Sequence, residues 1–228
     1  MVTATSLFDG HDAAINIMRR IIQSQGAEVI HLGHDRGVEE IVDVAIEEDV
    51  QGIAVSSYQG GHNEYFQYMV DLLKKRNSGH IQVFAGGGGV IIQSEIDALM
   101  EYGVNRVYSP EDGRELGLQG MITDMLKRSD FPLLTDDFKP DSGKLITDNI
   151  QHIARSLTWA ESSFTDDQNS ENQQKVTTFF EDLPDNSNIP VIGLTGTGGA
   201  GKSCLMDEMV RFFINEFPEK RVAIVSVD

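Results

Sequence analysis

Short apolar runs alternate with longer amphipathic segments along residues 1–128 of the chain. Each apolar run predicts a β-strand, and each is followed by a segment whose apolar residues recur at helical spacing. The predicted strands are residues 2–6, 28–32, 52–56, 82–85 and 106–109, and the predicted helices are residues 13–25, 38–48, 64–76, 93–102 and 113–128. Strand–helix pairs in this order predict an α/β fold, a doubly wound five-stranded parallel sheet with flavodoxin-like strand order.

The alternation stops at Phe131, where a polar segment rich in Asp and Pro begins. Helical spacing predicts a helix at residues 145–160 and one or two helical turns at residues 176–183. The acidic and amide-rich residues 162–174 predict a solvated loop. We therefore expect residues 131–188 to form a partly helical linker.

The last region of the chain predicts the first βαβ unit of a P-loop NTPase domain. Residues 191–195 and 222–227 predict strands, with a glycine loop and a helix at residues 202–217 between them. One helix and two strands cannot bury a core alone, so we expect residues 189–228 to be the opening of a longer domain. Residues 1–130 form the first predicted domain.

The composition narrows the class of protein. Hydrophobic residues are 40% of the 228 residues, enough for a buried core, whereas the net charge of −18 disfavours binding to nucleic acid or to an anionic membrane surface. The single cysteine, Cys204, excludes an intramolecular disulfide and an all-cysteine metal site. No apolar run approaches the ~18 residues of a membrane span, and no signal-peptide pattern opens the chain, so we expect a cytoplasmic protein.

The loop after the first predicted strand carries candidate metal-binding chemistry. Asp9 lies two residues before His11, a spacing that lets the carboxylate accept a hydrogen bond from Nδ1 of the imidazole. The other ring nitrogen then has the fixed lone pair that a metal ion requires. The loop lies beyond the carboxyl end of a strand, where doubly wound sheets bind ligands. Asp and His are also common in turns, so an exposed loop with a helix-capping Asp12 is the alternative.

Two further loops fall on the same predicted edge of the sheet. Ser56 and Tyr58 lie in the segment SSYQGGH at the end of the third strand, and residues 86–89 are four consecutive glycines after the fourth. Glycine permits positive φ angles and lets a ligand approach the backbone closely. Four glycines exceed what a turn requires, which favours a large ligand at this edge.

These three loop motifs together resemble the cobalamin-binding domain of the acyl-CoA mutases. The family pattern is Asp-x-His-x-x-Gly, then Ser-x-Leu, then Gly-Gly, and the resemblance covers residues 2–130. The chain departs from it at Ala14, where glycine is usual, and at Tyr58, where leucine is usual. These departures, with the string SLFDGHDAAINIMRR, are most similar to the fused isobutyryl-CoA mutases, and methylmalonyl-CoA mutase is the next relative.

The resemblance implies a cofactor and a role for each motif. His11 would be the lower axial ligand of the cobalt in adenosylcobalamin, in place of the cofactor's own dimethylbenzimidazole base, and Asp9 would orient His11. The nucleotide tail of the cofactor would lie in a slot past Ser56 and beside Gly88 and Gly89. The candidate cofactor-binding residues are Asp9, Gly10, His11, Ser56, Tyr58, Gly88 and Gly89.

Residues 196–203 match the phosphate-binding pattern G-x-x-x-x-G-K-[ST] at every defined position. Backbone N–H groups at the start of the predicted helix would bind phosphates. Lys202 would reach the β- and γ-phosphates, and the Ser203 hydroxyl would bind Mg²⁺. The candidate nucleotide-binding residues are Gly196, Gly198, Gly199, Ala200, Gly201, Lys202, Ser203 and Cys204.

The sequence around this loop resembles the G-protein chaperone domain of the acyl-CoA mutases, which implies GTP as the nucleotide. Asp228 matches an aspartate of that domain that would lie near Mg²⁺. The resemblance implies a homodimeric enzyme that interconverts isobutyryl-CoA and n-butyryl-CoA by a radical rearrangement. Its acyl-CoA substrate would bind to a barrel domain that these 228 residues lack, so we expect the chain alone to be inactive.

Other classes of protein stay open on the sequence alone. A methylmalonyl-CoA-type mutase would share the cobalamin domain. A non-catalytic corrinoid carrier would share the Asp-x-His loop but would not be followed by a phosphate-binding loop. A response-regulator-like module would require a phosphoaccepting aspartate at the end of the third strand, where this chain has Ser56.

Overall fold

The computed structural model describes residues 1–134, 138–146, 149–165, 170–183 and 189–225 of the chain. Two compact units are present, Met1–Asp182 and Leu183–Asp228. In the described residues, no helix is both long enough and apolar enough to cross a membrane.

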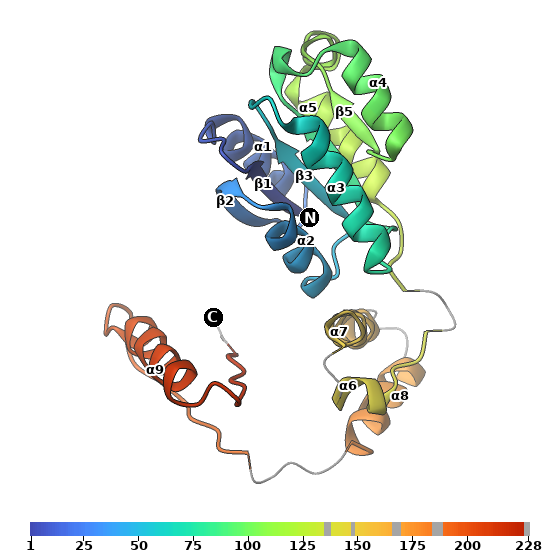
Figure 1. Ribbon diagram of the computed structural model, residues 1–228. Helices are drawn as coiled ribbons and strands as arrows, with labels where there is room; N and C mark the ends of the chain where they lie inside the picture. The colour runs from blue at the N-terminus through green and yellow to red at the C-terminus, as the bar shows by residue number, and fades with distance from the viewer. Residues whose placement is uncertain (135–137, 147–148, 166–169, 184–188, 226–228) are drawn as a thin grey trace. The chain divides into compact units, whose positions relative to one another are not determined.

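A five-stranded parallel sheet forms the centre of the first unit (Figure 1). Its strands are β1 (Val2–Ser6), β2 (Ile30–Arg36), β3 (Gly52–Ser56), β4 (Gln82–Gly86) and β5 (Arg106–Tyr108). They lie in the order β2-β1-β3-β4-β5 and every pair is parallel. This is the flavodoxin-like order, so the predicted fold class of this region is confirmed.

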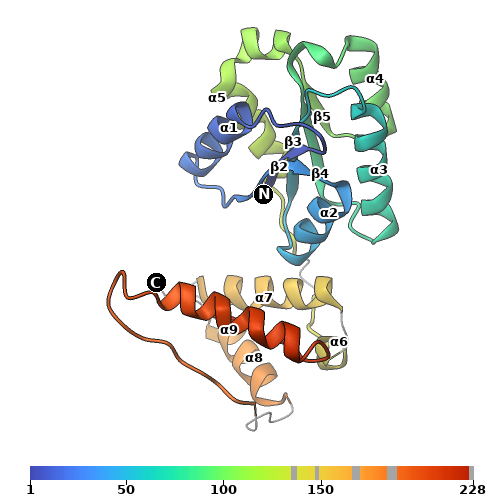
Figure 2. The ribbon, with the colours of Figure 1, turned by 60° about the vertical axis from the view of Figure 1, so that its left-hand side comes forward.

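Helices cover both faces of the sheet, as Figure 2 shows. One face carries α2 (Val38–Glu47), α3 (His62–Lys75) and α4 (Gln93–Tyr102), and the other carries α1 (Ala13–Ser24) and α5 (Pro110–Ser129). Strand side chains alternate between the two faces, so each face has its own core. Ile53 and Val55 belong to the first core, and Ala54 and Phe84 belong to the second.

Strand β2 differs most from its prediction, because it ends at Arg36 rather than at residue 32. Its pairing with β1 slips twice, between the partners of Thr3 and Ala4 and again between those of Ala4 and Ser6. Gly33 and Asp35 both have positive φ angles, 83° and 59°. These bulges insert two extra residues, which extends the pairing beyond the apolar run that indicated the strand.

Helix α5 begins three residues before its predicted start because Ser109 caps it. The Ser109 hydroxyl accepts a hydrogen bond from the backbone N–H of Asp112, and the Asp112 carboxylate accepts one from the backbone N–H of Ser109. Inside the helix, Gly117 has a φ angle of 65° and interrupts the helical backbone. The capped end places the start of α5 directly after β5.

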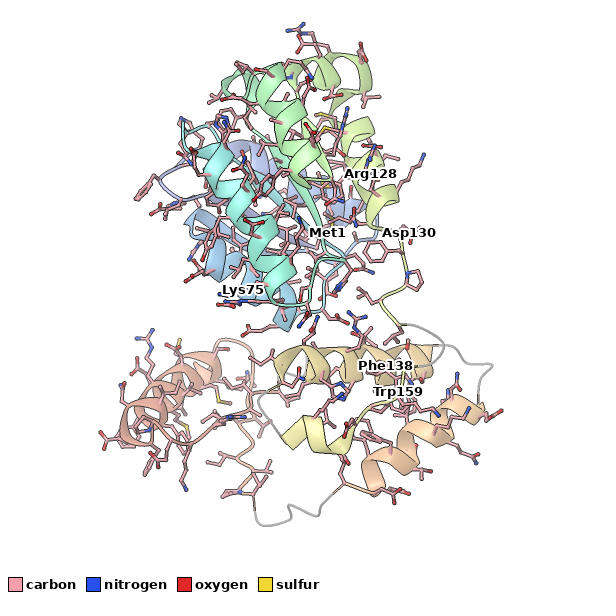
Figure 3. The ribbon with its side chains drawn as sticks, turned by 45° about the vertical axis from the view of Figure 1, so that its right-hand side comes forward. Met1, Lys75, Arg128, Asp130, Phe138 and Trp159 are labelled. Carbon is pink, nitrogen blue, oxygen red and sulfur yellow. The ribbon has the colours of Figure 1, made fainter. Side chains whose placement is uncertain are left out.

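Three helices follow the sheet: α6 (Ser142–Ile146), α7 (Ile150–Thr165) and α8 (Ser170–Glu181). Trp159 on α7, labelled in Figure 3, packs edge to face on Phe179 of α8, and the ring centroids are 6.0 Å apart. The predicted solvated loop at residues 162–174 is therefore wrong over its described part, where the chain is helical. The packing of the two rings stabilises both helices. Residues 166–169 lie outside the described residues. The predicted helix at 145–160 is divided between α6 and α7.

Within the first unit, helix α7 is attached to the loop after α2 through a buried carboxylate. Arg155 Nη2 lies 2.8 Å from Asp49 Oδ1, and the Thr158 hydroxyl donates to Asp49 Oδ2 at 2.9 Å. The Asp49 side chain is only 4% exposed. A buried charge requires a partner of this kind, so this part of the predicted linker packs as a folded element.

The second unit contains one described helix, α9 (Lys202–Glu216). The strands predicted at residues 191–195 and 222–227 are not formed in the described residues, which end at residue 225. Val191 is 92% exposed and Val225 is 84% exposed. A strand requires a neighbouring strand to satisfy its backbone groups, and none is formed in the described part of this unit, so the predicted βαβ unit is corrected to a loop and a helix.

Candidate functional site

The loops that follow β1, β3, β4 and β5 meet at one edge of the sheet, because parallel strands end on the same side. The carboxyl ends of these strands are in register: Thr5, the penultimate residue of β1, pairs with Ser56, Ser56 pairs with Gly86, and Gly86 pairs with Tyr108. The sheet thereby forms one continuous row of residues at the base of the site. The predicted candidate residues Ser56, Tyr58 and Gly88 lie on or directly after this row.

Asp9 is the buried centre of the site, with a side chain that is 1% exposed. Its Oδ1 accepts hydrogen bonds from the backbone N–H of His11 at 2.9 Å and from Nδ1 of the His11 ring at 2.8 Å. Its Oδ2 accepts a hydrogen bond from the backbone N–H of Tyr58 at 2.5 Å. The alternative of an exposed turn is therefore wrong for Asp9.

The hydrogen bonds determine the charge on Asp9. Burial raises the pKa of its carboxyl group, but the hydrogen bonds from Tyr58 and His11 outweigh burial and hold the pKa below its usual value. An ionised carboxylate can only accept, so the proton of a neutral His11 ring lies on Nδ1. Nε2 of His11 then carries the lone pair of the ring, and the His11 side chain is 77% exposed.

The helix-capping role of Asp12 is not formed, since its side chain makes no hydrogen bond to the backbone of α1. Asp12 Oδ2 instead accepts a hydrogen bond from Asn16 Nδ2 at 3.2 Å. Gly10 lies beside it, and a Cβ atom added there would meet no atom within 4 Å. The loop is thus fixed in place through the hydrogen bonds of Asp9, and the space around Gly10 is open.

Tyr58 lies between His11 and the glycine run. The ring centroids of His11 and Tyr58 are 5.6 Å apart. A Cβ atom added to Gly88 would lie 3.0 Å from the Tyr58 ring, and Gly88 has a φ angle of 55°. Gly88 therefore needs to be glycine both for its backbone conformation and for the room that the Tyr58 ring occupies.

A cavity of about 200 Å³ opens beside these residues, between the sheet and helices α1 and α5. Most of its lining side chains are apolar. Those at the strand ends and the first turn of α5 are Ser56, Tyr58, Gly86, Gly87, Gly88, Tyr108, Ser109 and Pro110. Ala14 lines it from the first turn of α1, and the lining residues of the second core include Met18, Phe84, Met121 and Met125. The sequence predicted Ser56, Tyr58 and Gly88, which lie at the opening of the cavity. It did not predict the deeper lining residues, because their spacing is the same as that of any other buried helix or strand residue.

Of the two glycines expected beside the ligand, Gly88 lines the cavity and Gly89 does not. Gly86, Gly87 and Gly88 line it, whereas Gly89 is outside the lining and a Cβ atom there would meet nothing within 4 Å. A Cβ atom on Gly87 would lie 2.1 Å from the Ser57 carbonyl oxygen. The glycine lining therefore extends from Gly88 back to Gly86, the last residue of β4.

Two buried contacts that the sequence did not indicate support the loops. The hydroxyl of Ser6 donates to that of Ser57 at 2.8 Å, which joins the ends of β1 and β3. His62 is 3% exposed; its Nδ1 donates to the Gln59 carbonyl oxygen at 3.0 Å, and its Nε2 lies 3.1 Å from Glu95 Oε2. His62 therefore ties the loop after β3 to the first turn of α4.

In the second unit, residues 196–203 form a glycine loop that leads into α9. Gly199 and Gly201 have φ angles of 77° and 81°, and Lys202 is the first residue of the helix. Lys202 Nζ donates to the carbonyl oxygen of Thr197 at 3.0 Å, so its side chain folds back over the loop. Cys204 is exposed, and Asp228 lies outside the described residues.

The arrangement at the sheet edge can hold a large ligand that bears a metal ion. His11 offers one exposed imidazole nitrogen, and no group of three or more potential metal-ligating side chains occurs in the described ranges. A metal held only by His11 would need its remaining ligands from a cofactor. The neighbouring cavity and its glycine wall can accept a further part of the same molecule, so the residues present fit cobalamin.

Two family models match the chain. The B12 binding domain matches residues 1–107, and the methylmalonyl Co-A mutase-associated GTPase MeaB matches residues 153–228. The first match covers β1 to β5 and every loop of the sheet-edge site. The second begins within α7 and includes the glycine loop before α9. Together they imply cobalamin and GTP as the molecules that the two regions bind.

Curated proteins are similar to the chain over its full length. It is 57% identical to a fused isobutyryl-CoA mutase of Geobacillus kaustophilus, covering 100% of this chain and 21% of that protein. It is 51% identical to a fused isobutyryl-CoA mutase of Cupriavidus metallidurans, covering 20% of that protein. The chain thus spans about a fifth of the length of these relatives. It is also 35% identical to the 2-hydroxyisobutanoyl-CoA mutase small subunit of Aquincola tertiaricarbonis over 43% of this chain and 71% of that protein.

Proposed function

The chain belongs to the acyl-CoA mutase family, with a B12 binding domain followed by part of a MeaB GTPase region, and from this premise we propose that residues 1–130 bind adenosylcobalamin through His11. Nε2 of His11 would be the protein ligand of the cobalt. When bound, the cofactor supplies a radical for carbon-skeleton rearrangement. The residues of this chain hold and orient it.

The observation that carries the proposal is the geometry of Asp9 and His11. The carboxylate of Asp9 binds both the backbone and the ring of His11, so the ring has a fixed orientation and Nδ1 is the protonated nitrogen. A carboxylate behind the imidazole raises the basicity of the other nitrogen, as in metal-ligating histidines generally. A histidine in an ordinary surface turn would have neither a buried carboxylate as its partner nor a fixed tautomer.

The cavity beside Tyr58 supports the second part of the proposal, that the nucleotide tail of the cofactor enters the sheet edge. Gly86 and Gly88 leave room along one wall, and Ser56 contributes a hydroxyl at the opening. The apolar inner walls exclude water and suit a flat aromatic base. Ala14 also lines the cavity, so the methyl group that replaces the usual glycine narrows the site without closing it.

For the second region, we propose binding of GTP with Mg²⁺ by the glycine loop. Lys202 begins α9 at the position where a phosphate-binding loop places its lysine, and Ser203 follows it. Ser203 and Asp228 would contribute to the Mg²⁺ site, and Gly196, Gly198, Gly199, Ala200, Gly201 and Cys204 would surround the phosphates. Of the predicted nucleotide-binding unit, only the glycine loop and helix α9 have support from the fold of the described residues.

For the complete protein, we propose the interconversion of isobutyryl-CoA and n-butyryl-CoA. The support is the likeness to fused isobutyryl-CoA mutases over the whole chain. The acyl-CoA would bind outside residues 1–228, and a homodimer in the cytoplasm would be the working form. Within these residues the function is to hold cobalamin and to contribute to nucleotide binding.

The proposal is tested with two cofactor probes on the purified chain. Adenosylcobalamin gives the affinity. Adenosylcobinamide lacks the nucleotide tail and its base, so a protein imidazole is the nitrogen ligand that can change its visible spectrum from that of the base-free form. We expect the wild-type chain to produce this change and His11→Ala to abolish it. Unaltered spectra with bound adenosylcobinamide would refute His11 as the ligand.

A further inference from the structure

A strained turn holds the loop that carries His11. The backbone N–H of Asp9 donates to the Ser6 carbonyl oxygen at 3.1 Å, which closes a four-residue turn with Phe8 in its third position. Phe8 has a φ angle of 65°, and the residue is 83% exposed. Turns with a positive φ angle at this position strongly favour glycine or asparagine. Phenylalanine there is a conformational misfit that no burial of its ring offsets.

Asp35 is the residue that holds this turn. Its Oδ1 accepts a hydrogen bond from the backbone N–H of Phe8 at 2.7 Å, although the two residues belong to different strand ends. Asp35 has a positive φ angle itself and lies at the second bulge of β2. Bulges next to functional sites often redirect a side chain. Here the bulge directs the Asp35 carboxylate to the strained turn.

The backbone next to Asp35 is fixed from the opposite side. The carbonyl oxygen of Arg36 accepts a hydrogen bond from the hydroxyl of Tyr65 at 2.7 Å, and Tyr65 is a buried residue of α3. Burial raises the pKa of the Tyr65 hydroxyl, so this donor keeps its proton at neutral pH. Asp35 is therefore attached to the core of the domain, whereas Phe8 lies at the exposed tip of its loop.

We propose that Asp35 is a positioning residue for His11, acting through the strained turn at Phe8. The inference rests on the proposed function, in which His11 is the cobalt ligand. The turn reverses the chain directly before Asp9. Its conformation therefore determines how the Asp9 side chain points into the core and how the His11 side chain points to solvent. Without the Asp35 hydrogen bond, Phe8 relaxes to a negative φ angle and the Asp9–His11 pair loses its fixed geometry.

The competing explanation is that the bulges of β2 only protect an edge strand from pairing with another molecule. Protection of the edge strand depends on the bulged backbone of β2 and not on the hydrogen bond between the Asp35 carboxylate and Phe8. The two explanations differ in their response to Phe8→Gly. Glycine adopts the positive φ angle without strain, so it removes the need for Asp35 only if Asp35 acts through Phe8.

The experiment compares Asp35→Ala, Asp35→Asn, Phe8→Gly and the double variant Phe8→Gly/Asp35→Ala in the whole chain. The first readout needs no cofactor: the ¹⁵N-histidine NMR signal of the Nδ1–H of His11, which the hydrogen bond to Asp9 protects from exchange. The second is the affinity for cob(II)alamin and the fraction of it that is bound through a protein nitrogen. Circular dichroism confirms that each variant is folded.

We expect Asp35→Ala to lose the protected Nδ1–H signal and to bind cob(II)alamin about tenfold more weakly, a usual cost of removing a residue that supports a metal ligand. Asp35→Asn keeps an oxygen acceptor and should stay close to wild type, and the double variant should recover both readouts. A protected signal in Asp35→Ala, or a double variant no better than Asp35→Ala, would overturn the inference. Absence of protein-nitrogen binding in the wild type would instead refute the proposed function, while the NMR comparison would still decide the role of Asp35.

Discussion

The backbone N–H of Tyr58 donates to Oδ2 of Asp9 at 2.5 Å, across 49 residues of sequence. The same carboxylate receives two hydrogen bonds from His11 through its other oxygen. One buried side chain thus joins the loop after β1 to the loop after β3. The orientation of the candidate metal ligand and the shape of the cavity opening depend on the same group.

This shared carboxylate leads to the first prediction, for Asp9→Asn. The amide oxygen can replace only one of the two carboxylate oxygens, so an NH₂ group must face either the Tyr58 N–H or the donors of His11. We expect cobalamin affinity to fall about 10- to 100-fold with the fold retained. Titration of the visible spectrum measures the loss, and Asp12→Asn on the same loop is the matched control. Equal affinity in Asp9→Asn and wild type would contradict the prediction.

The second prediction concerns pH. The pKa of Asp9 is lower in the folded protein than its ordinary value of about 3.9. The carboxylate therefore stabilises the folded chain fully above pH ~4, and this contribution is lost as the pH falls through the folded pKa. We expect the difference in urea midpoint between wild type and Asp9→Asn to be constant down to pH ~4 and to shrink below it. A carboxyl ¹³C titration that places the Asp9 pKa above its ordinary value would contradict this account.

The third prediction tests the cavity with two glycines of the same run. Gly86 lines the cavity, and a Cβ atom there would meet only the Tyr108 carbonyl oxygen, at 3.9 Å. Gly86→Val should therefore fold, because valine suits a strand, but should fill the slot and abolish cobalamin binding. Gly89→Val is the control, since it lies outside the lining with open space around it. Equal affinities in the two variants would show that the tail binds elsewhere.

The fourth prediction concerns nucleotide binding by the second unit. A phosphate-binding loop needs a rigid set of backbone amides, and the segments on either side of this one form no strands in the described residues. We expect the 228-residue chain to bind GTP·Mg²⁺ weakly in equilibrium dialysis and to show no GTP hydrolysis above background. Hydrolysis that Lys202→Ala abolishes would contradict this prediction, because it would show that the glycine loop is active without flanking strands.

Much of the fold could be predicted because the strands and helices of residues 1–128 follow clear periodicities. The bulges of β2 could not, since Gly33 and Asp35 take their positions from pairing with β1 and not from their own sequence. The predicted strand at residues 191–195 was wrong for the opposite reason. Its apolar composition indicates a strand, but strand formation also depends on neighbours that local sequence does not reveal.

The candidate site could be predicted in outline, because Asp9, His11 and the glycine run have distinctive spacing. The burial of Asp9 and its bond to Tyr58 could not, since they depend on how two distant loops meet. The part played by Gly86 was also missed. Four identical residues carry no information on which of them faces the cavity until the end of β4 is known.

The central claim is that Nε2 of His11 binds cobalt, and electron paramagnetic resonance tests it most directly. Cob(II)alamin is bound to chain whose histidines are labelled with ¹⁵N, and the superhyperfine splitting identifies the axial nitrogen. If Nε2 of His11 binds the cobalt, we expect the doublet of a ¹⁵N ligand in the wild-type chain and its loss in His11→Ala. The triplet of a ¹⁴N ligand, which belongs to the cofactor's own base, would contradict the claim.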